Sequence, residues 1–175
     1  MGQFEIWQSP SDLKIGIVRA TDKPMQIALR PAGTQDFEYC KRLYFAGMKR
    51  TIEELNLAMA AQSVSFREQW ALEQVRIISV DNSDVGWLQS ATQDDGLFVA
   101  QLFVDRPFQR QGIGTEVMSR LIGEAARLNQ AVRLAVVKIN PALRLYERLG
   151  FRITHEDDRK FYMKRDPDTA ASISN

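Results

Sequence analysis

Residues 97–115, LFVAQLFVDRPFQRQGIGT, decide the fold of this chain, because a strand, a loop and a helix start follow one another there. Residues 97–104 are almost entirely apolar and predict a buried strand. A short basic loop with Gly112 and Gly114 leads into an amphipathic helix. Such a loop directs several backbone N–H groups and the positive end of the helix toward one point, which suits a phosphate group. We therefore expect a phosphorylated cofactor.

Size and composition predict one globular domain with short appendages. The chain has 175 residues, of which 45% are hydrophobic and 26% are charged. We expect an N-terminal extension at residues 1–24, a domain at residues 25–165 and a tail at residues 166–175, and we consider Met25 a candidate natural start. The single cysteine excludes an internal disulfide and a multi-cysteine metal site, so we expect no metal.

The distribution of apolar and charged residues narrows the partners. No apolar run approaches the roughly 20 residues that span a bilayer, and the first residues lack a basic leader, so we expect a cytoplasmic protein without membrane contact. Residues 1–100 carry 10 basic and 13 acidic side chains, whereas residues 101–165 carry 13 and 7. The basic half suits a polyanionic cofactor. Basic and acidic residues alternate within it and no nucleic-acid-binding motif is present, so we expect no nucleic-acid partner.

The periodicity elsewhere predicts an α/β domain with a mixed sheet. We expect strands at residues 26–30, 75–80, 85–91, 97–104, 132–137, 151–154 and 160–164. A first helix is expected after Thr34, and capping boxes at Thr51 and Ser65 predict two further short helices. A helical stripe runs from Ile113 to Leu128, and a last helix is expected from Asn140 to Gly150, with asparagine as its cap.

Two common phosphate-binding loops do not match the glycine spacing. A P-loop has a lysine directly after its second glycine, whereas here Ile113 separates the glycines and Thr115 follows without a lysine. A dinucleotide-binding fingerprint has a third glycine three residues after the second, and the chain has Val117 there. We therefore exclude both loop types.

The remaining pattern, Gln109-x-x-Gly112-x-Gly114 after a strand, resembles the signature of the GCN5-related N-acetyltransferases, the GNAT family. A second block, NPALRLYERLGF at residues 140–151, resembles the closing motif of the same family and follows at the right distance. The resemblance covers residues 26–164. It implies a single domain with a mixed, mostly antiparallel sheet, helices on both faces, and a splay between the fourth and fifth strands.

The resemblance also implies the site residues. The cofactor is acetyl-CoA, whose pantetheine arm pairs with the strand at Leu102, Phe103 and Val104, and Asn140 contacts the same arm. Tyr146 lies beside the sulfur as the catalytic acid. The residues implied to wrap the pyrophosphate are Gln109, Arg110, Gln111, Gly112, Ile113, Gly114 and Thr115.

The implied function is acetyl-CoA-dependent N-acetylation of a primary amine, by direct transfer in a ternary complex. The acceptor is expected to be a small molecule, in a pocket built by residues 34–72, the turn after Val80 and the final hairpin. Family members often pair through sheet edges or helices, so a homodimer stays open. A phenol can give a proton to a departing thiolate, and backbone donors can stabilise the oxyanion.

The general base is not defined by this pattern. The strand before the loop offers Gln101 and no carboxylate, which leaves Glu53, Glu54, Asp95 or a chain of water molecules. The missing carboxylate keeps a second interpretation open, in which the domain binds acyl-CoA as a sensor without catalysis.

Several residues also have purely structural interpretations. The two glycines would permit a tight turn, Asn140 would cap a helix, and Tyr146 would pack in the core. We expect Cys40 to be a small buried hydrophobic residue and His155 to lie on the surface of the final hairpin.

Overall fold

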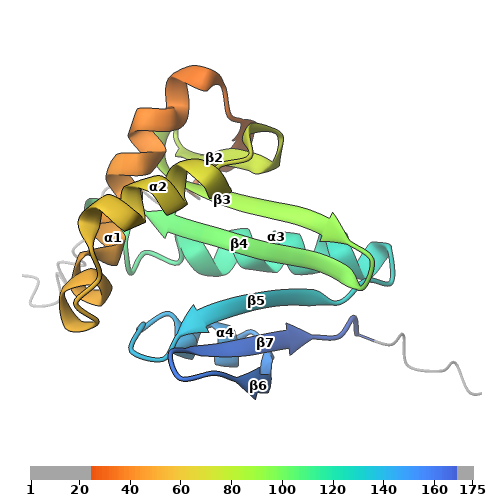
Figure 1. Cartoon of the computed structure of the whole chain (residues 1–175). Coiled ribbons are helices and arrows are strands. Elements are labelled where there is room, and N and C mark those ends of the chain that lie inside the picture. Colours follow the sequence, from red (N-terminus) through yellow and green to blue (C-terminus); the bar gives the residue numbers. More distant parts are fainter. Residues whose placement is uncertain (1–24, 169–175) are drawn as a thin grey trace, which may run out of the picture.

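The computed structural model describes residues 25–168, which form one seven-stranded sheet with helices on both faces (Figure 1). The strands are β1 (Ile27–Pro31), β2 (Val75–Val80), β3 (Ser83–Gln93), β4 (Gly96–Val104), β5 (Val132–Val137), β6 (Arg152–Glu156) and β7 (Lys160–Arg165). The helices are α1 (Phe37–Glu54), α2 (Met59–Gln69), α3 (Ile113–Arg127) and α4 (Leu143–Arg148). Short 3₁₀ turns lie at Thr34–Asp36, Leu72–Gln74 and Arg106–Phe108. The predicted α/β class with a mixed sheet is confirmed.

The strand order is β1-β2-β3-β4-β5-β7-β6, and β4 with β5 is the one parallel pair of neighbours in the described sheet. Helix α3 makes the crossover that a parallel pair requires. The β4–β5 ladder begins at Leu97 and Val132 and ends at Val99 and Leu134. Both strands continue beyond that point, so the predicted splay between the fourth and fifth strands is confirmed.

Two hydrophobic clusters lie on opposite faces of the sheet. The first packs α3 and α4 against one face, through Val117 and Leu121 of α3 and Tyr146 of α4. The second packs α1 and α2 against the other face of β2–β4, around Trp87. It is rich in aromatic rings, and its buried members are Cys40, Leu43, Tyr44, Phe66, Val75, Ile77 and Trp87. The prediction that Cys40 is buried is confirmed.

Helix α1 approaches the sheet closely at Gly47. A Cβ atom built on Gly47 would lie 2.7 Å from Cδ1 of Phe103, so only glycine leaves room for that ring between the helix and β4. Phe103 in turn stacks on Trp87, with ring centroids 5.3 Å apart. The contact fixes where α1 crosses β4.

Several predicted helix boundaries are wrong. Thr51 and Ser65 lie inside α1 and α2, because the intervening residues continue each helix and tertiary packing overrides the local capping signal. Leu128, expected on the buried stripe, is 69% exposed, because α3 ends at Arg127 and the chain turns away. The last helix begins at Leu143 and not at Asn140.

Other predictions fall outside what the structure tests. The extension at residues 1–24, its boundary at Met25, and residues 169–175 of the tail lie outside the described residues. Among residues 25–168, no helix is both long and apolar enough to cross a membrane.

Candidate active site

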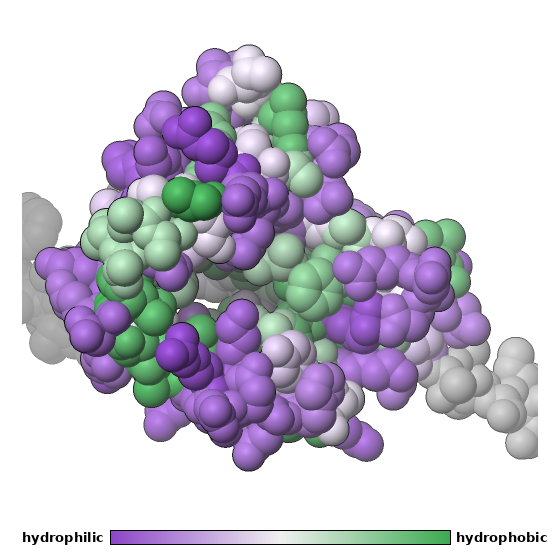
Figure 2. All heavy atoms as spheres, viewed as in Figure 1, coloured by the Kyte–Doolittle hydropathy of each residue, from purple (hydrophilic) through white to green (hydrophobic). Residues whose placement is uncertain are grey.

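The opening between β4 and β5 begins where their ladder stops. β4 keeps its pairing with β3 as far as Val104, but on the other side Ala100–Val104 have no strand partner among the described residues. Ala100 is an extra residue in the ladder, since Ser90 pairs with Val99 and Gln89 with Gln101. Such a bulge bends β4 at the start of the opening. Figure 2 shows the surface hollowed between the β4 half and the β5–β7 half.

The predicted cofactor strand lies along this opening. Leu102 and Val104 pack against the α3 side of the sheet, whereas Phe103 packs against α1 and Trp87 on the other side. The side chains therefore point to the two faces of the sheet, and the backbone N–H and C=O groups of β4 face the gap. An extended ligand can add to such an edge as a further strand.

The loop after β4 is braced by its own polar side chains. The Asp105 carboxylate accepts a hydrogen bond from the N–H of Arg106 (2.8 Å), and the Gln109 amide donates to the Val104 carbonyl oxygen (2.8 Å). The Gln111 amide donates to the carbonyl oxygen of Pro107 (2.9 Å). Both predicted glutamines thus hold the loop in shape through their side chains, which leaves any cofactor contact to their backbone.

The loop backbone has the conformation of an anion-binding turn. Arg110 and Gly112 have φ values of 63° and 85°, and Gly112 directly precedes α3. Among the described residues, the N–H groups of residues 110–115 have no hydrogen-bond partner. The Ile113 side chain is 1% exposed and fixes this turn to the core. Consecutive free N–H groups at the start of a long helix fit a pyrophosphate.

The closing motif lies beside this loop. A Cβ atom on Gly114 would lie 3.6 Å from Cδ2 of Leu145, so the start of α3 and helix α4 are in contact. The Asn140 carboxamide oxygen accepts a hydrogen bond from the N–H of Ala142 (2.9 Å). The prediction that Asn140 is the N-cap of the last helix is wrong, since α4 has Ala142 at its N-cap; the Asn140 side chain instead closes the turn before the helix.

Tyr146 is buried within the α3–α4 cluster and packs edge-on against Phe151, with ring centroids 5.9 Å apart. Its hydroxyl group has no hydrogen-bond partner among the described residues, and its oxygen keeps some access to solvent. Burial raises the pKa of Tyr146 to about 12, so the phenol keeps its proton at neutral pH.

Each of the candidate bases is held in an ion pair with a basic residue. Glu53 pairs with Lys49 (3.9 Å) on the exposed side of α1, and Glu54 pairs likewise with Arg50. Asp95 pairs with Arg133 near the closed end of the β4–β5 ladder. β4 rises about 3.3 Å per residue, which puts Asp95 more than 20 Å from the loop end of the strand.

Gln101 does lie next to the opening, half-buried and paired with Gln89. Its carboxamide does not ionise and so cannot take the proton.

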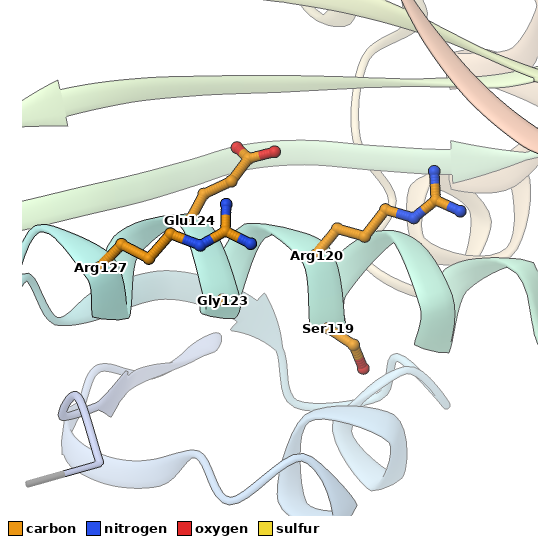
Figure 3. A pocket seen from close by; sticks show the side chains of 5 residues that line it. All are labelled: Ser119, Arg120, Gly123, Glu124 and Arg127. Atoms are coloured by element: carbon orange, nitrogen blue, oxygen red, sulfur yellow. The ribbon is translucent and has the colours of Figure 1, made fainter. Parts of the chain in front are cut away.

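A second depression runs along α3, lined by Ser119, Arg120, Gly123, Glu124 and Arg127 (Figure 3). Figure 3 shows the two arginines and Glu124 pointing to the same side of the helix. Arg120 donates to the Ile27 carbonyl oxygen (2.7 Å), and Glu124 lies 3.5 Å from Arg76. These charges attach α3 to β1 and β2, so the depression is a helix–sheet seam.

Sequence reasoning missed one ordered group, on the final hairpin. His155 is exposed as predicted, but its ring stacks on Tyr162, whose hydroxyl group donates to Asp157 (2.9 Å). The alternation in residues 160–164 could have indicated this group, because it predicts that Tyr162 points to the other face of the strand from Phe161 and Met163. Residues 25–168 contain no group of three side chains that could hold a metal ion.

The chain resembles known proteins both in a family model and in its fold. The family model described as Acetyltransferase (GNAT) domain matches residues 71–153. No curated protein matches the chain by sequence. Among solved structures, the PaiA N-acetyltransferase from Thermoplasma acidophilum in complex with coenzyme A is 16% identical, with a TM-score of 0.68, covering 81% of this chain and 99% of that one.

Two bacterial structures are similar in the same way. The ribosomal-protein-S18-alanine N-acetyltransferase from Escherichia coli is 17% identical, with a TM-score of 0.60 and coverage of 86% of this chain and 99% of its own. An N-acetyltransferase from Staphylococcus aureus Mu50 is 14% identical, with a TM-score of 0.62 and coverage of 79% and 100%. Identities this low establish the shared fold alone. Residues 71–153 thus match the acetyltransferase (GNAT) domain, and the described chain has the GNAT fold.

Proposed function

We propose that the chain is an acetyl-CoA-dependent N-acetyltransferase that acts on a primary amine, most readily a small molecule, in a ternary complex. The observation that carries the proposal is the unpaired edge of β4 beside the free N–H groups of residues 110–115. One feature fits an extended amide-bearing arm and the other fits a pyrophosphate, and coenzyme A joins these two groups in one molecule. The GNAT domain supports the same ligand.

In this proposal the bound cofactor supplies a reactive acetyl thioester, and the chain binds, orients and manages protons. The loop at Gln109–Thr115 holds the pyrophosphate through its backbone, and the β4 edge at Leu102–Val104 aligns the pantetheine arm. The Asn140 amide nitrogen, whose partner oxygen already accepts from Ala142, donates toward the same arm in this proposal. A backbone N–H at the β4 opening stabilises negative charge on the acetyl oxygen, an effect commonly worth about 3 kcal/mol.

Tyr146 holds the proton that the departing sulfur needs. A phenol of pKa about 12 is a weak acid toward an ordinary thiolate. Burial also destabilises an anionic sulfur in the same place and so raises the pKa of the thiol. The pKa values of the phenol and of the thiol therefore lie closer together. The amine loses its proton to water that reaches the opening, since Gln101 cannot ionise.

The first test is calorimetric titration with acetyl-CoA and coenzyme A, with ATP as the control ligand. Micromolar affinity for the two CoA ligands and none for ATP supports the proposal, and absence of CoA binding contradicts it. The second test compares Tyr146→Phe with the unchanged protein. We expect turnover to fall about 100-fold or more, with CoA affinity within twofold.

The alternative is an acyl-CoA sensor with the same fold, which the missing carboxylate near Gln101 favours. It predicts CoA binding without release of free thiol in the presence of any amine of a broad panel. Unchanged low turnover in Tyr146→Phe would count against Tyr146 as the acid.

A further inference from the structure

The face of β5 and β7 that looks away from α3 and α4 carries no helix. Leu134 of β5 and Met163 of β7 belong to the α3–α4 cluster. Side chains alternate along a strand, so Ala135 and Tyr162 point to the opposite face. Figure 1 shows α1 and α2 lying over β2–β4 and leaving β5 and β7 uncovered on that side. The uncovered face begins at the opening of the candidate active site.

Tyr162 stands upright on this face. Its ring is stacked on the His155 ring of the neighbouring strand, with centroids 4.2 Å apart and planes only 7° from parallel. The stack runs from strand to strand, so one side of the Tyr162 ring is covered by His155. The other side faces β5 and, beyond it, the opening.

Three hydrogen bonds hold the hairpin that carries this ring. Oδ2 of Asp157 accepts the Tyr162 hydroxyl proton (2.9 Å), while Oδ1 accepts the N–H groups of Arg159 (2.8 Å) and Lys160 (2.7 Å). The ring is therefore anchored at its outer end by a carboxylate that the turn itself holds in place.

Thr154 fixes the histidine. Its hydroxyl donates to the Tyr162 carbonyl oxygen (3.1 Å) and lies 3.1 Å from Nδ1 of His155. A hydroxyl group has one proton, so Nδ1 is the donor in the second contact. Both rings of the stack are thus held by hydrogen bonds from the hairpin.

The residue that lies in front of the free ring face has a small side chain. The β5 partner of Tyr162 is Ala135, the first residue after Leu134, where the β4–β5 ladder ends. A methyl group leaves the space before the ring open. Neighbouring strands lie about 4.8 Å apart, so the ring stands one strand from the opening. On the far side of the opening, β4 presents Gln101 and Phe103.

An open aromatic face one strand from the reaction site suits a cation. The ring carries negative charge density on its face, and the Asp157 carboxylate at its hydroxyl group adds to the attraction. The other charges on this face are Lys160, Arg152 opposite Lys164 on β6, Lys164 paired with Asp166 (2.7 Å), and Arg133 paired with Asp95. Two of the four cations are neutralised by a carboxylate, and the Asp157 carboxylate at the ring also faces Lys160, so the attraction that a further cation meets comes from the ring face itself.

We propose that the free face of Tyr162, above Ala135, binds the acceptor amine as an alkylammonium ion before it is deprotonated. The inference rests on the proposed function, since it names the acceptor class for that same site. Such a site would bind alkylamines, which are cations at neutral pH, but not aryl amines, whose nitrogen is uncharged.

Binding is tested without catalysis by using His155 as a reporter. His155 is the single histidine of the chain, so the proton on its Cε1 gives one assignable NMR signal in tag-free protein. The protein is titrated with n-butylammonium chloride, with 1-butanol as the neutral counterpart and sodium chloride as the ionic-strength control. We expect a saturable shift with n-butylammonium alone. No saturable shift, or an equal shift with 1-butanol, overturns the proposal.

Two variants test the contribution of the Tyr162 ring and that of the space above Ala135 independently. Tyr162→Leu removes the aromatic face, and Ala135→Leu fills the space before it. Each variant should weaken n-butylammonium binding by roughly 3- to 30-fold, the range of cation–π contacts. Tyr162→Phe keeps the ring face and should stay within about threefold. Lys164→Ala, on the same face of β7 but toward its other end, is the matched control. If Ala135→Leu leaves binding unchanged, the site is wrong even where Tyr162→Leu fails to fold.

Calorimetry with coenzyme A on the same samples distinguishes the two levels of inference. Normal CoA binding without an n-butylammonium effect contradicts the acceptor site and leaves the proposed function intact. Loss of CoA binding in the unchanged protein contradicts the proposed function itself. With turnover available, Tyr162→Leu should raise KM for an alkylamine more than it lowers kcat.

Discussion

The two halves of this sheet are packed differently. Strands β2–β4 are covered on both faces, by α1 and α2 on one side and by α3 on the other, and Trp87 lies fully buried between layers. Strands β5, β7 and β6 are covered on the α3–α4 face alone, and every residue of β6 is exposed. One half is a closed core, while the other half has an accessible face beside the opening.

The difference shows how one sheet serves stability and binding together. Burial of large aromatic side chains supplies stability, so the covered half fixes where β4 lies. The open half needs only enough packing to hold β5 and β7 in register. The reactive opening lies at the border, where β4 leaves the pairing with β5 but keeps its pairing with β3.

The largest expected effect is in the covered half. Trp87→Ala should lower the free energy of unfolding by about 3–5 kcal/mol, because it leaves a cavity among Phe66, Trp70 and Phe103. Tyr162→Ala in the open half should cost less than half as much. Urea denaturation of both variants makes the comparison, and equal losses would contradict the contrast between the halves.

The second prediction concerns the border. Gly112→Ala places a side chain at φ 85°, which costs about 1–2 kcal/mol although the space around an added Cβ is open. The loop should relax, turn its N–H groups away, and weaken CoA binding by about tenfold or more. Gly123→Ala, inside α3, is the matched control, since nothing lies within 4 Å of its added Cβ and its φ is not positive. Calorimetry should find near-normal CoA affinity in that control.

A third prediction tests the edge of the covered half by pH. Arg30 donates two hydrogen bonds to Asp36 (2.9 and 3.0 Å) and one to Asp84 (2.6 Å), and these contacts lower the pKa of both carboxyl groups. A lowered pKa in the folded state contributes stability above the unfolded value near 4, which is lost as pH falls through the folded value.

The thermal midpoint should therefore fall between about pH 5 and pH 2, and it should fall less in Asp36→Asn. Arg30 is 39% exposed, so the contribution at neutral pH is on the order of 1 kcal/mol. An identical pH profile in the variant would show that this cluster does not tie β1 to the sheet.

The smallest effect is expected at Leu128, which is 69% exposed although it continues the α3 stripe in sequence. Leu128→Gln should change the free energy of unfolding by less than about 0.5 kcal/mol. Leu121→Ala, two helical turns back on the same stripe and fully buried, should cost about 2–5 kcal/mol. Denaturation of the pair defines where the packed face of α3 ends.

Local sequence determined much of the fold and of the cofactor half of the site. Alternation and apolar runs predicted the strands at residues 75–80, 97–104 and 132–137, because side-chain period follows directly from backbone geometry. The spacing of Gln109, Gly112 and Gly114 predicted the turn into α3, since a positive φ favours glycine at that place. The capping signals at Thr51 and Ser65 failed, because packing against the sheet extends helices through residues that would otherwise start them.

The tertiary structure alone decided what the two halves of the sheet do. No local pattern states that the β4–β5 ladder stops at Val99 and Leu134, or that Asp95 is held in an ion pair with Arg133. These facts depend on strand order and register between residues tens of positions apart. Sequence fixes which backbone shapes and faces each segment favours, whereas the meeting of distant segments is set by how those faces cover one another.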